Sequence, residues 1–419
     1  ERAISLCPHA NEFWGNKALI LQQMARYEEA LVSVDRCLQL KPLCTTTLYN
    51  RGNILKALGR LDEAIASFQR ASILRLRSIK EIPVGSKEQY LLQQDIVLGY
   101  WNLALTFLLK GNLEQGWLLY EYRWQWDNFP STRRNFKQPL WLGQAPLAGK
   151  TIFLHSEQGL GDTLQFCRYV PLLKAQGARV ILAIEPPLVS LLSSLQGLDM
   201  LISQGNQIPN FDYHCPLLTL PLACRTWSLE SIPAQVPYLS APSAQMEVWR
   251  NKLGKKSKPR VGLVWSSGAR PGLPEYARRD IPFSLMAQLN RDDIDFYSLQ
   301  KGQPAESLLL EHKNQYWSSD NFYIFSEHIK DFADTAALIG QLDLVISVCT
   351  SVVHLAGALG VPTWVLLPSG ADWRWLLERT DSPWYPSLRL FRQKKFGDWQ
   401  SVIRLVQEAL NHFVTSSPT

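Results

Sequence analysis

The chain has 419 residues, of which 46% are hydrophobic and 19% charged, and this composition excludes disordered, collagen-like and coiled-coil proteins. At roughly 100 to 200 residues per domain, the length predicts two to four domains. The net charge is a modest +6, and the basic residues form no stripe or motif of a nucleic-acid-binding protein, so we expect no nucleic-acid partner. A small anionic ligand, in contrast, would suit the positive net charge.

The seven cysteines are odd in number and include no CxxC pair, so the sequence predicts neither a disulfide framework nor a zinc site. Several lie in apolar segments, which favours buried free thiols in a reducing cytoplasm. No apolar run reaches 18 residues and no signal peptide is visible, so we expect a cytoplasmic protein without a transmembrane helix. The acidic residues show no metal-ligand pattern, and we expect no metal.

An internal repeat opens the chain. Residues 11–42 and 45–76 align with a period of 34 residues, and Tyr-Glu-Glu-Ala at 27–30 matches Leu-Asp-Glu-Ala at 61–64. Small residues recur where two helices would cross, and large apolar residues recur where neighbouring units would meet. The pattern resembles the tetratricopeptide repeat, a helix–turn–helix unit. The alternative is a plain bundle of four to six helices.

Two further segments fit the same register. Residues 2–8 align with 36–42, and residues 112–116 align with 60–64 after an insertion near 78–94, where we expect a loop or an extended helix. Because about three repeats are needed to bury a continuous core, we expect further repeats before Glu1 in the natural protein. The repeats are predicted over residues 1–124, followed by an ordered linker over 125–149 that is rich in Pro, Gly and aromatic residues.

From Lys150 onward, short apolar strands alternate with helices, which predicts parallel sheets covered on both faces. The alternation occurs twice, in an N-terminal half over 150–254 and a C-terminal half over 255–419 that ends in a helix. The fold class is therefore α + α/β, with tetratricopeptide repeats followed by two Rossmann-like domains. The expected strands are 151–155, 179–183, 199–202, 260–265, 295–299, 343–348 and 362–367, and the segments 212–216 and 217–222 complete the N-terminal half. The expected helices are 163–176, 186–195, 335–341, 351–359 and 399–413.

The first candidate site follows the strand that opens the N-terminal half. Gly159 and Gly161 let the backbone approach a ligand closely, and the following helix offers free N–H groups and a partial positive charge. The segment is not a GxGxxG fingerprint and lacks the lysine of a P-loop. Asp162 has two interpretations, as the N-cap of the helix or as a general base at the carboxyl edge of the sheet.

The second candidate site lies between a strand and a helix in the C-terminal half. Cys349, Thr350 and Ser351 form the turn, and His354 follows one helical turn later. Hydroxyl groups and free helix N–H groups suit a diphosphate. His354 is either a structural side chain or a hydrogen-bond donor to phosphate or ribose.

Scattered polar residues form a third group. Lys301 ends a strand and is either a counter-charge for a leaving phosphate or a solvated loop charge. Arg278 and Arg279 lie in a polar loop, and either could bind phosphate through its guanidinium fork. Asp331 is predicted to cap the helix that precedes Gln341.

Residues 159–166, 331–337 and 347–360 resemble the heptosyltransferase-like glycosyltransferases of family nine. The layout is similar to bacterial, especially cyanobacterial, tetratricopeptide-repeat proteins with such a domain, and to O-GlcNAc transferases, whose repeats precede a GT-B pair. The resemblance covers residues 1–124 for the repeats and about 150–395 for the enzyme. It implies a GT-B fold, a nucleotide-diphosphate sugar as donor substrate with no cofactor, and an inverting reaction without a metal.

The same resemblance implies roles for particular residues. The family's proposed base falls on Asp162, in the loop that contains Gly159 and Gly161. The family's donor site falls on Thr350, Ser351 and His354, and Lys301 resembles a phosphate-facing lysine.

One departure from the family lies at Cys349, where relatives carry an aspartate at the donor site. Cysteine lacks the two carboxylate oxygens and the charge, which implies altered donor choice or lost activity. The loop over 266–271 also departs, because it replaces a Gly-Asn-Pro-like run.

The resulting prediction is a GT-B glycosyltransferase. Asp162 would remove the acceptor proton, and helix N–H groups with Thr350, Ser351, Lys301 and Arg279 would stabilise the leaving diphosphate. The repeats are expected to bind a protein or peptide acceptor. The alternatives are a catalytically degenerate, nucleotide-sugar-binding repeat scaffold and a sugar epimerase of similar GT-B architecture.

Overall fold

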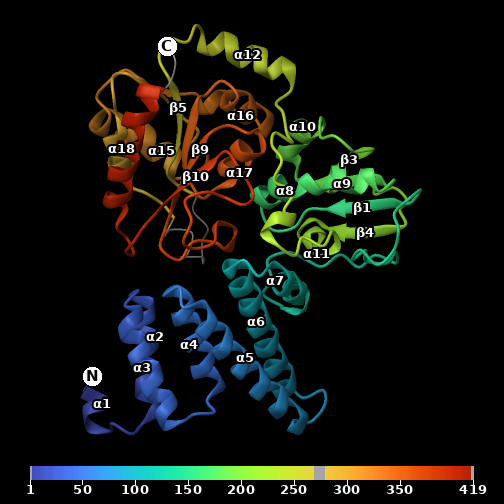
Figure 1. The fold of residues 1–419 in the computed structure, drawn as a ribbon, viewed down its shortest axis with the longest axis vertical. Coiled ribbons are helices and arrows are strands. Elements are labelled where there is room, and N and C mark those ends of the chain that lie inside the picture. The colour runs from blue at the N-terminus through green and yellow to red at the C-terminus, as the bar shows by residue number, and fades with distance from the viewer. Residues whose placement is uncertain (1, 269–278, 417–419) are drawn as a thin grey trace. The chain divides into compact units, whose positions relative to one another are not determined.

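The computed structural model describes residues 2–268 and 279–416 (Figure 1). These residues form two compact units. The repeat unit runs to Arg134 and also includes Arg225–Ser231 and Gly370–Glu378, while the α/β unit holds the other described residues. The predicted fold class is confirmed, because a helical N-terminal region is followed by two parallel, Rossmann-like sheets. None of the helices in the described ranges is both long and apolar enough to cross a membrane.

Among the described residues, seven α-helices build the repeat unit, and six of them pack as successive pairs, α2 with α3, α4 with α5 and α6 with α7. The insertion in the repeat register forms a short 3₁₀ turn, Ile79–Glu81, and lengthens the next helix to 24 residues. The Ser86 hydroxyl caps that helix by accepting a hydrogen bond from the Gln89 N–H. The helices are α1 Arg2–Leu6, α2 Asn11–Gln23, α3 Tyr27–Leu40, α4 Thr45–Ala57, α5 Leu61–Ser78, α6 Lys87–Lys110 and α7 Leu113–Tyr120.

Small side chains let these helix pairs approach closely. Ala18, Ala30 and Ala64 are fully buried. A Cβ built on Gly52 would lie 2.5 Å from the Phe68 ring, so Phe68 packs directly against the backbone of α4. The same residue types recur every 34 positions because each pair repeats the same crossing.

Two segments distant in sequence complete the repeat unit. The indole rings of Trp117 and Trp373 meet at right angles with centroids 5.2 Å apart, and Leu229 packs beside Gly111 at the end of α6. Residues 126–150, all of them described, form no helix or strand, although Trp141 is buried and donates its indole N–H to the Ala145 carbonyl. The division between the two units falls within this segment.

The first sheet contains four parallel strands in the order β3-β2-β1-β4. The strand order reverses between β1 and β4, and ligands of open α/β sheets bind at the carboxyl ends of strands beside such a switch point. The strands are β1 Thr151–His155, β2 Arg179–Ile184, β3 Met200–Ser203 and β4 Tyr213–Pro216.

The second sheet contains six parallel strands in the order β10-β9-β8-β5-β6-β7. Counted along the chain from the first strand of this sheet, this is the Rossmann order, and the switch point lies between β5 and β8. The strands are β5 Arg260–Val264, β6 Asp295–Ser298, β7 Phe322–Ile324, β8 Leu344–Val348, β9 Thr363–Leu367 and β10 Leu388–Arg392.

Several expected elements differ in the structure. The helix predicted over 163–176 is wrong as a single element, because it divides into α8 Leu160–Phe166, a 3₁₀ turn and α9 Val170–Ala175, and Pro171 can start α9 but cannot continue α8. Two short strands, β7 and β10, and three helices, α12 Ser243–Leu253, α14 Phe283–Met286 and α15 Ala305–Tyr316, were not predicted from the sequence. The segment 217–222 contains a 3₁₀ turn, Leu217–Thr219, that leads into α11 Leu220–Ala223. The remaining helices are α10 Val189–Leu192, α16 Phe332–Ile339, α17 Ser351–Ala358 and α18 Trp399–Ser416.

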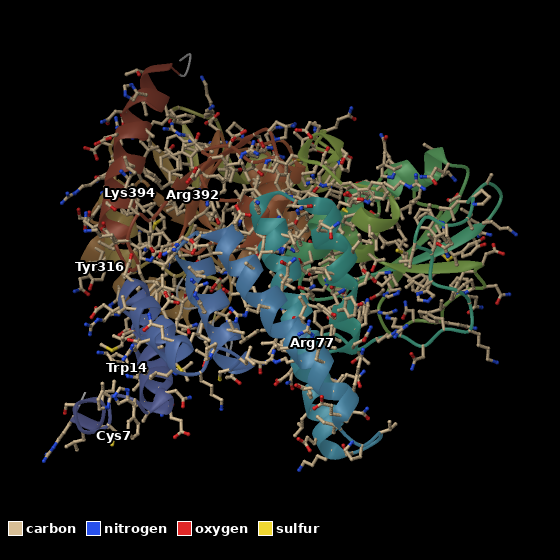
Figure 2. The ribbon with its side chains drawn as sticks, turned by 60° about the horizontal axis from the view of Figure 1, so that its bottom comes forward. Cys7, Trp14, Arg77, Tyr316, Arg392 and Lys394 are labelled. Atoms are coloured by element: carbon tan, nitrogen blue, oxygen red, sulfur yellow. The ribbon has the colours of Figure 1, made fainter. Side chains whose placement is uncertain are left out.

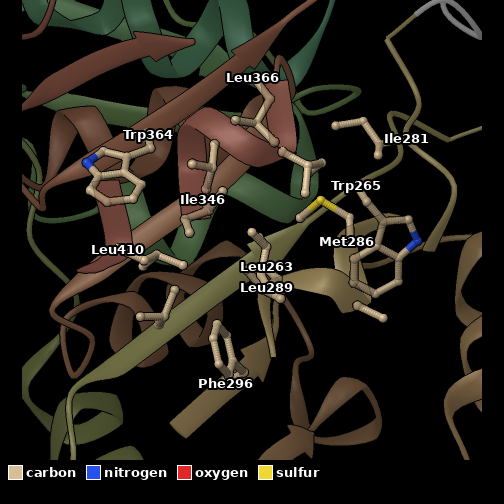
Figure 3. Packing of buried hydrophobic residues seen from close by; sticks show 14 of the residues in the cluster. Leu263, Trp265, Ile281, Met286, Leu289, Phe296, Ile346, Trp364, Leu366 and Leu410 are labelled. Carbon is tan, nitrogen blue, oxygen red and sulfur yellow. The ribbon is translucent and has the colours of Figure 1, made fainter. Parts of the chain in front are cut away.

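The core of the second sheet positions the loops that follow its strands. Leu263, Ile346 and Leu366 extend from adjacent strands into one buried cluster, which Trp265, Met286 and Leu410 complete (Figure 3). Leu410 belongs to α18, whose buried residues recur every three to four positions and form one apolar face.

Candidate functional site

The loop after β1 contains the first candidate site. Gly159 is the N-cap residue of α8, so the interpretation of Asp162 as the N-cap is wrong in position. Asp162 instead lies in the first helical turn, where its Oδ2 accepts a hydrogen bond of 2.9 Å from the Gly159 N–H. The Asp162 N–H donates in turn to the Gly159 carbonyl at 2.9 Å. These reciprocal bonds fix the carboxylate at the start of α8.

The two candidate sites lie against one another in the α/β unit, because α8 packs against α17. A Cβ built on Gly161 would lie 2.9 Å from Cδ2 of His354 and 3.4 Å from Cα of Ser351. Glycine is therefore the residue that permits this approach. Gly161, Ser351 and His354 meet although about 190 positions separate the two segments in the sequence.

The start of α17 has the local geometry of an anion-binding helix terminus. Thr350 is the N-cap residue, and its hydroxyl accepts a hydrogen bond of 3.3 Å from the Val352 N–H. The Ser347 hydroxyl donates to the Val348 carbonyl at 2.7 Å, which fixes the end of β8. Ser351 begins the helix, so its N–H has no partner within the helix. The terminus thus combines hydroxyl groups with the positive end of the helix dipole.

His354 lies on the face of α17 that packs against the protein interior. The side chain is buried, and its Nδ1 lies 3.0 Å from the Tyr385 hydroxyl. Its opposite edge, Cδ2 and Nε2, faces Gly161. The structure therefore shows a packed histidine beside the start of α8, a geometry compatible with both interpretations from the sequence.

Cys349 lies between β8 and the Thr350 cap, is buried and is not part of a disulfide. The position is close to the helix terminus, so a carboxylate there would lie beside Thr350 and Ser351. A thiol is a weak donor and a weak acceptor, so it offers far less hydrogen bonding than a carboxylate would.

Lys301 follows β6, which neighbours β5 in the sheet. Its side chain is half-exposed, and Nζ donates to the Ser326 carbonyl at 2.6 Å and lies 3.6 Å from Glu306 Oε1. The ammonium group therefore has protein partners and is not simply a solvated loop charge. A phosphate oxygen at this position would have to share Lys301 with Glu306.

The loop after β5 lies on the β5 side of the switch point between β5 and β8. The Gln300 Oε1 accepts hydrogen bonds from the N–H groups of Trp265 and Ser266, at 3.2 and 3.0 Å. Asp280 accepts from the Ser266 hydroxyl and the Ser267 N–H, at 2.8 and 2.7 Å. These N–H groups are thereby bonded within the protein, whereas the Ser351 N–H at the start of α17 has no partner within its helix.

Arg279 precedes Asp280 and is half-buried. The structure thus places Arg279 next to the carboxylate that holds the loop after β5. Arg278 and residues 269–271 of the loop that departs from the family lie outside the described residues.

A second carboxylate, which the sequence analysis did not identify, lies beside Asp162. Glu185 follows β2, and its Oε2 accepts a hydrogen bond of 3.0 Å from the Thr163 hydroxyl. Burial raises the pKa of Glu185 above its usual value of 4.5, and the negative charge of Asp162 contributes in the same direction. The only signal in the sequence was a Glu directly after a strand, which surface loops share.

We expect Glu185→Gln to stabilise the protein at neutral pH. A carboxyl group whose pKa is raised on folding contributes most to stability below its unfolded pKa, and this contribution is lost as the pH rises through the folded value. The gain in melting temperature of the variant over the wild type should therefore grow as the pH rises from about 4.5. Thermal unfolding of both proteins across this range measures it.

Asp199→Asn is the matched control for this experiment. The hydrogen bond from Lys174 lowers the pKa of Asp199, so its effect has the opposite sign, and the variant should lose stability relative to the wild type as the pH rises through acid values. If Glu185→Gln raised the melting temperature by the same amount at all pH values, the result would contradict a raised pKa of Glu185.

Across residues 2–268 and 279–416, no group of three or more His, Cys, Asp or Glu side chains is arranged to hold a metal ion.

Arg392 ends β10 and precedes Lys394 (Figure 2), and burial lowers the pKa of Arg392 to about 10. β9 separates β10 from β8, so Arg392 is not beside the switch point.

Comparison with known proteins identifies the repeats. Residues 12–42 and 45–72 match the tetratricopeptide repeat family, which confirms the prediction of repeats for the two units predicted at 11–42 and 45–76. A relative, protein FlbA of Caulobacter vibrioides, is 27% identical over 99% of this chain and 69% of its own length.

Among solved structures, a family 9 glycosyl transferase from Veillonella parvula is 11% identical with a TM-score of 0.48, over 65% of this chain and 99% of its own. The O-GlcNAc transferase of Thermobaculum terrenum, as a mutant, is 13% identical with a TM-score of 0.33, over 99% of this chain and 88% of its own. The chain therefore carries tetratricopeptide repeats within residues 12–72, and its fold continues with two parallel, Rossmann-like sheets.

Proposed function

We propose that this chain is a glycosyltransferase that moves a sugar from a nucleotide-diphosphate sugar to an acceptor hydroxyl, with inversion and without a metal. The observation that carries the proposal is the approach of Gly161 to Ser351 and His354. It brings a carboxylate at the start of α8 close to a hydroxyl-rich helix terminus at the start of α17. A base and an anion site side by side are what transfer from a diphosphate donor requires.

In the proposed reaction, Asp162 accepts the proton of the acceptor hydroxyl while the oxygen bonds to C1 of the sugar. The bond from C1 to the diphosphate oxygen breaks, and its electron pair leaves with the nucleotide. Attack from the face opposite the leaving group inverts the configuration at C1. The protonated Asp162 then loses its proton to solvent.

The leaving diphosphate carries the developing negative charge. We assign its stabilisation to the N–H groups and hydroxyls of Thr350 and Ser351, to His354, and to the cations Lys301 and Arg279. The Rossmann order of the second sheet supports this assignment, because α17 follows β8 and Lys301 follows β6, on either side of β5 at the switch point.

We further propose that the acceptor is a protein or peptide that binds the repeats, and that the protein acts in the cytoplasm. The family match over residues 12–72 supports the first statement, because repeat arrays present extended binding surfaces. Hydrogen–deuterium exchange of the full chain with and without an acceptor tests it. Protection confined to the α/β unit would contradict an acceptor site on the repeats.

The experiment that tests the function is nucleotide release across a panel of nucleotide-diphosphate sugars, with calorimetric binding measured in parallel. Turnover with one donor would support a transferase and identify the sugar class. Binding without turnover would favour the second candidate, a catalytically degenerate scaffold, for which the thiol at Cys349 is the specific observation. If the chain showed no binding and no turnover with any of these donors, that result would contradict a role in nucleotide-sugar chemistry.

We expect Cys349→Asp to raise turnover by about tenfold, because one charge-assisted hydrogen bond contributes roughly 1.5–3 kcal/mol. The carboxylate would accept this hydrogen bond from a hydroxyl of the donor sugar, while the positive end of the α17 dipole would offset its charge beside the diphosphate. The rate of nucleotide release with the best donor measures the effect. Cys349→Ser, which adds no charge, serves as the control, and equal rates for the three proteins would show that Cys349 does not limit the reaction.

A further inference from the structure

Lys56 of α4 is a half-buried cation in the repeat unit. Among residues 2–268 and 279–416, no Asp or Glu side chain forms an ion pair with its Nζ. Burial lowers the pKa of Lys56 to about 8, because removing the ammonium group from water disfavours its charged form. Within the part of the chain that the structure describes, this charge is thus left without a counter-charge.

Asn102 of α6 holds the Lys56 ammonium group in place. The Nζ atom donates to the Asn102 Oδ1 at 2.9 Å and lies 5.9 Å from the centroid of the Phe68 ring. Asn102 is buried, and its amide nitrogen donates to the Tyr49 hydroxyl at 2.7 Å and to the Leu98 carbonyl at 3.1 Å. These bonds fix the Asn102 oxygen toward Lys56. An ammonium group has three donors, and among the described residues only Asn102 accepts from it, so two donors remain for a ligand.

Other polar groups of the repeat unit lie near Lys56. Tyr49, Asn53 and Lys56 follow one another at spacings of four and three positions, so they share one face of α4. The Arg75 guanidinium of α5 lies 5.5 Å from the centroid of the Tyr49 ring and forms an ion pair of 3.4 Å with Asp95 of α6. Arg75 therefore matches the charge of Asp95, and the cluster keeps one net positive charge, which suits an anionic ligand.

We propose that Lys56 binds a carboxylate of a peptide ligand, either the C-terminal group or an Asp or Glu side chain. The carboxylate would accept charge-assisted hydrogen bonds from the two remaining donors of Nζ. The contact between Lys56 and Asn102 joins the first helices of two successive pairs, and repeat arrays bind extended segments on surfaces that successive units share. The proposal names the chemical class of the acceptor peptide, and it rests on the proposed function only for sugar transfer to that peptide.

The test begins with a library of short peptides of random sequence, offered to the full chain once with free C-termini and once with amidated C-termini. We expect the bound peptides to carry a carboxylate. Enrichment of Asp or Glu in the amidated library would identify a side chain as the ligand, and binding confined to the free-acid library would identify the C-terminal group. Bound peptides without a preference for carboxylates, or an absence of bound peptides, would overturn the proposal.

Lys56→Gln should weaken the binding of a selected peptide by about tenfold or more, because it removes the charge from the hydrogen bonds to the carboxylate. The variant should fold, since burial already opposes the charge that it removes. Fluorescence polarisation of the labelled peptide measures the affinity, and thermal unfolding checks the fold.

The pH dependence of binding separates a charge at Lys56 from a packing role. Between about pH 7 and pH 9 the affinity of the wild type should fall about tenfold, because the charged fraction of Lys56 falls as the pH rises through its pKa of about 8. Lys56→Arg stays charged, so its affinity should not change over this range. Burial raises the pKa of Tyr49 above its usual value of 10, and Arg75 and Asp95 are present in both proteins. An affinity of the wild type that is independent of pH would contradict the proposal.

Lys110→Gln is the matched control. Lys110 ends α6, and its ammonium group is paired with the Asp62 carboxylate. The variant removes the same charge from the repeat unit and leaves Lys56 and Asn102 unchanged, so its peptide affinity should match the wild type. An equal loss in Lys110→Gln and Lys56→Gln would assign the effect to net charge and overturn the site.

These measurements separate the carboxylate site from the proposed function, because peptide binding is measured without a sugar donor. Selected peptides that bind equally well to the wild type and to Lys56→Gln would overturn the carboxylate site and would leave the repeats as the acceptor surface. Binding that depends on Lys56, without sugar transfer to the bound peptide, would support the site and contradict its role in acceptor binding.

Discussion

Asp162→Asn is expected to lower turnover by ~10²–10⁴-fold, the usual contribution of a general base. The amide cannot accept the proton of the attacking hydroxyl, but its oxygen can still accept the hydrogen bond from the Gly159 N–H. The start of α8 should therefore keep its structure, and the loss should appear in kcat. Initial rates of nucleotide release, at saturating donor and acceptor, measure the change.

Asp212→Asn provides the matched control for Asp162→Asn. The Asp212 carboxylate also accepts a backbone hydrogen bond, from the Thr151 N–H at 2.7 Å. It directly precedes β4 and lies at the amino end of β1, whereas Asp162 follows the carboxyl end of β1. We expect its turnover to match the wild type. Unchanged turnover in Asp162→Asn would exclude Asp162 as the base and would leave its bond to Gly159 as its role.

Gly161→Ala is expected to reduce both stability and turnover. A Cβ 2.9 Å from His354 Cδ2 and 3.4 Å from Ser351 Cα requires that the buried His354 ring shifts or that α8 and α17 move apart. Overpacking of this kind costs about 1–3 kcal/mol. A displacement of 1 Å between a base and a substrate can lower the rate by about 10²-fold. Chemical denaturation and nucleotide release together measure the two effects.

Gly15→Ala separates this contact from the general preference of helices for alanine. Gly15 lies within α2, and a Cβ there would meet its nearest neighbour, Cys37 Sγ, at an ordinary 3.7 Å. Alanine is favoured over glycine in helices by roughly 1 kcal/mol, so Gly15→Ala should be neutral or stabilising. If Gly161→Ala behaved in the same way, the close packing of α8 on α17 would not matter for function.

The sequence by itself determined the features that depend on local periodicity. The repeat register at 34 residues predicted the helix pairs, and the alternation after Lys150 predicted most strands of both sheets. The turns with Gly159 to Asp162 and Cys349 to Ser351 were identified because strand–turn–helix junctions have distinctive residue types. Asp331 caps α16 as predicted, with Oδ1 accepting from the N–H groups of Ala333 and Asp334.

Elements with weak local signals were missed. The strands β7 and β10 contain three and five residues, too few for a clear alternation. The helix α15 buries only Ala305 and Leu309, so its sequence carries no broad apolar stripe. Pro171 in the predicted helix over 163–176 was a local signal for the division that the structure shows.

Only the tertiary structure decided which segments meet. The approach of Gly161 to His354, the position of Glu185 beside Asp162, and the contact of Lys56 with Asn102 all join residues that are distant in sequence. The residues next to a side chain in the sequence determine whether it lies in a helix or in a strand. The residues that it contacts from other segments depend on strand order and packing. For that reason the chemistry of each candidate residue was readable from the sequence, whereas its surroundings were not.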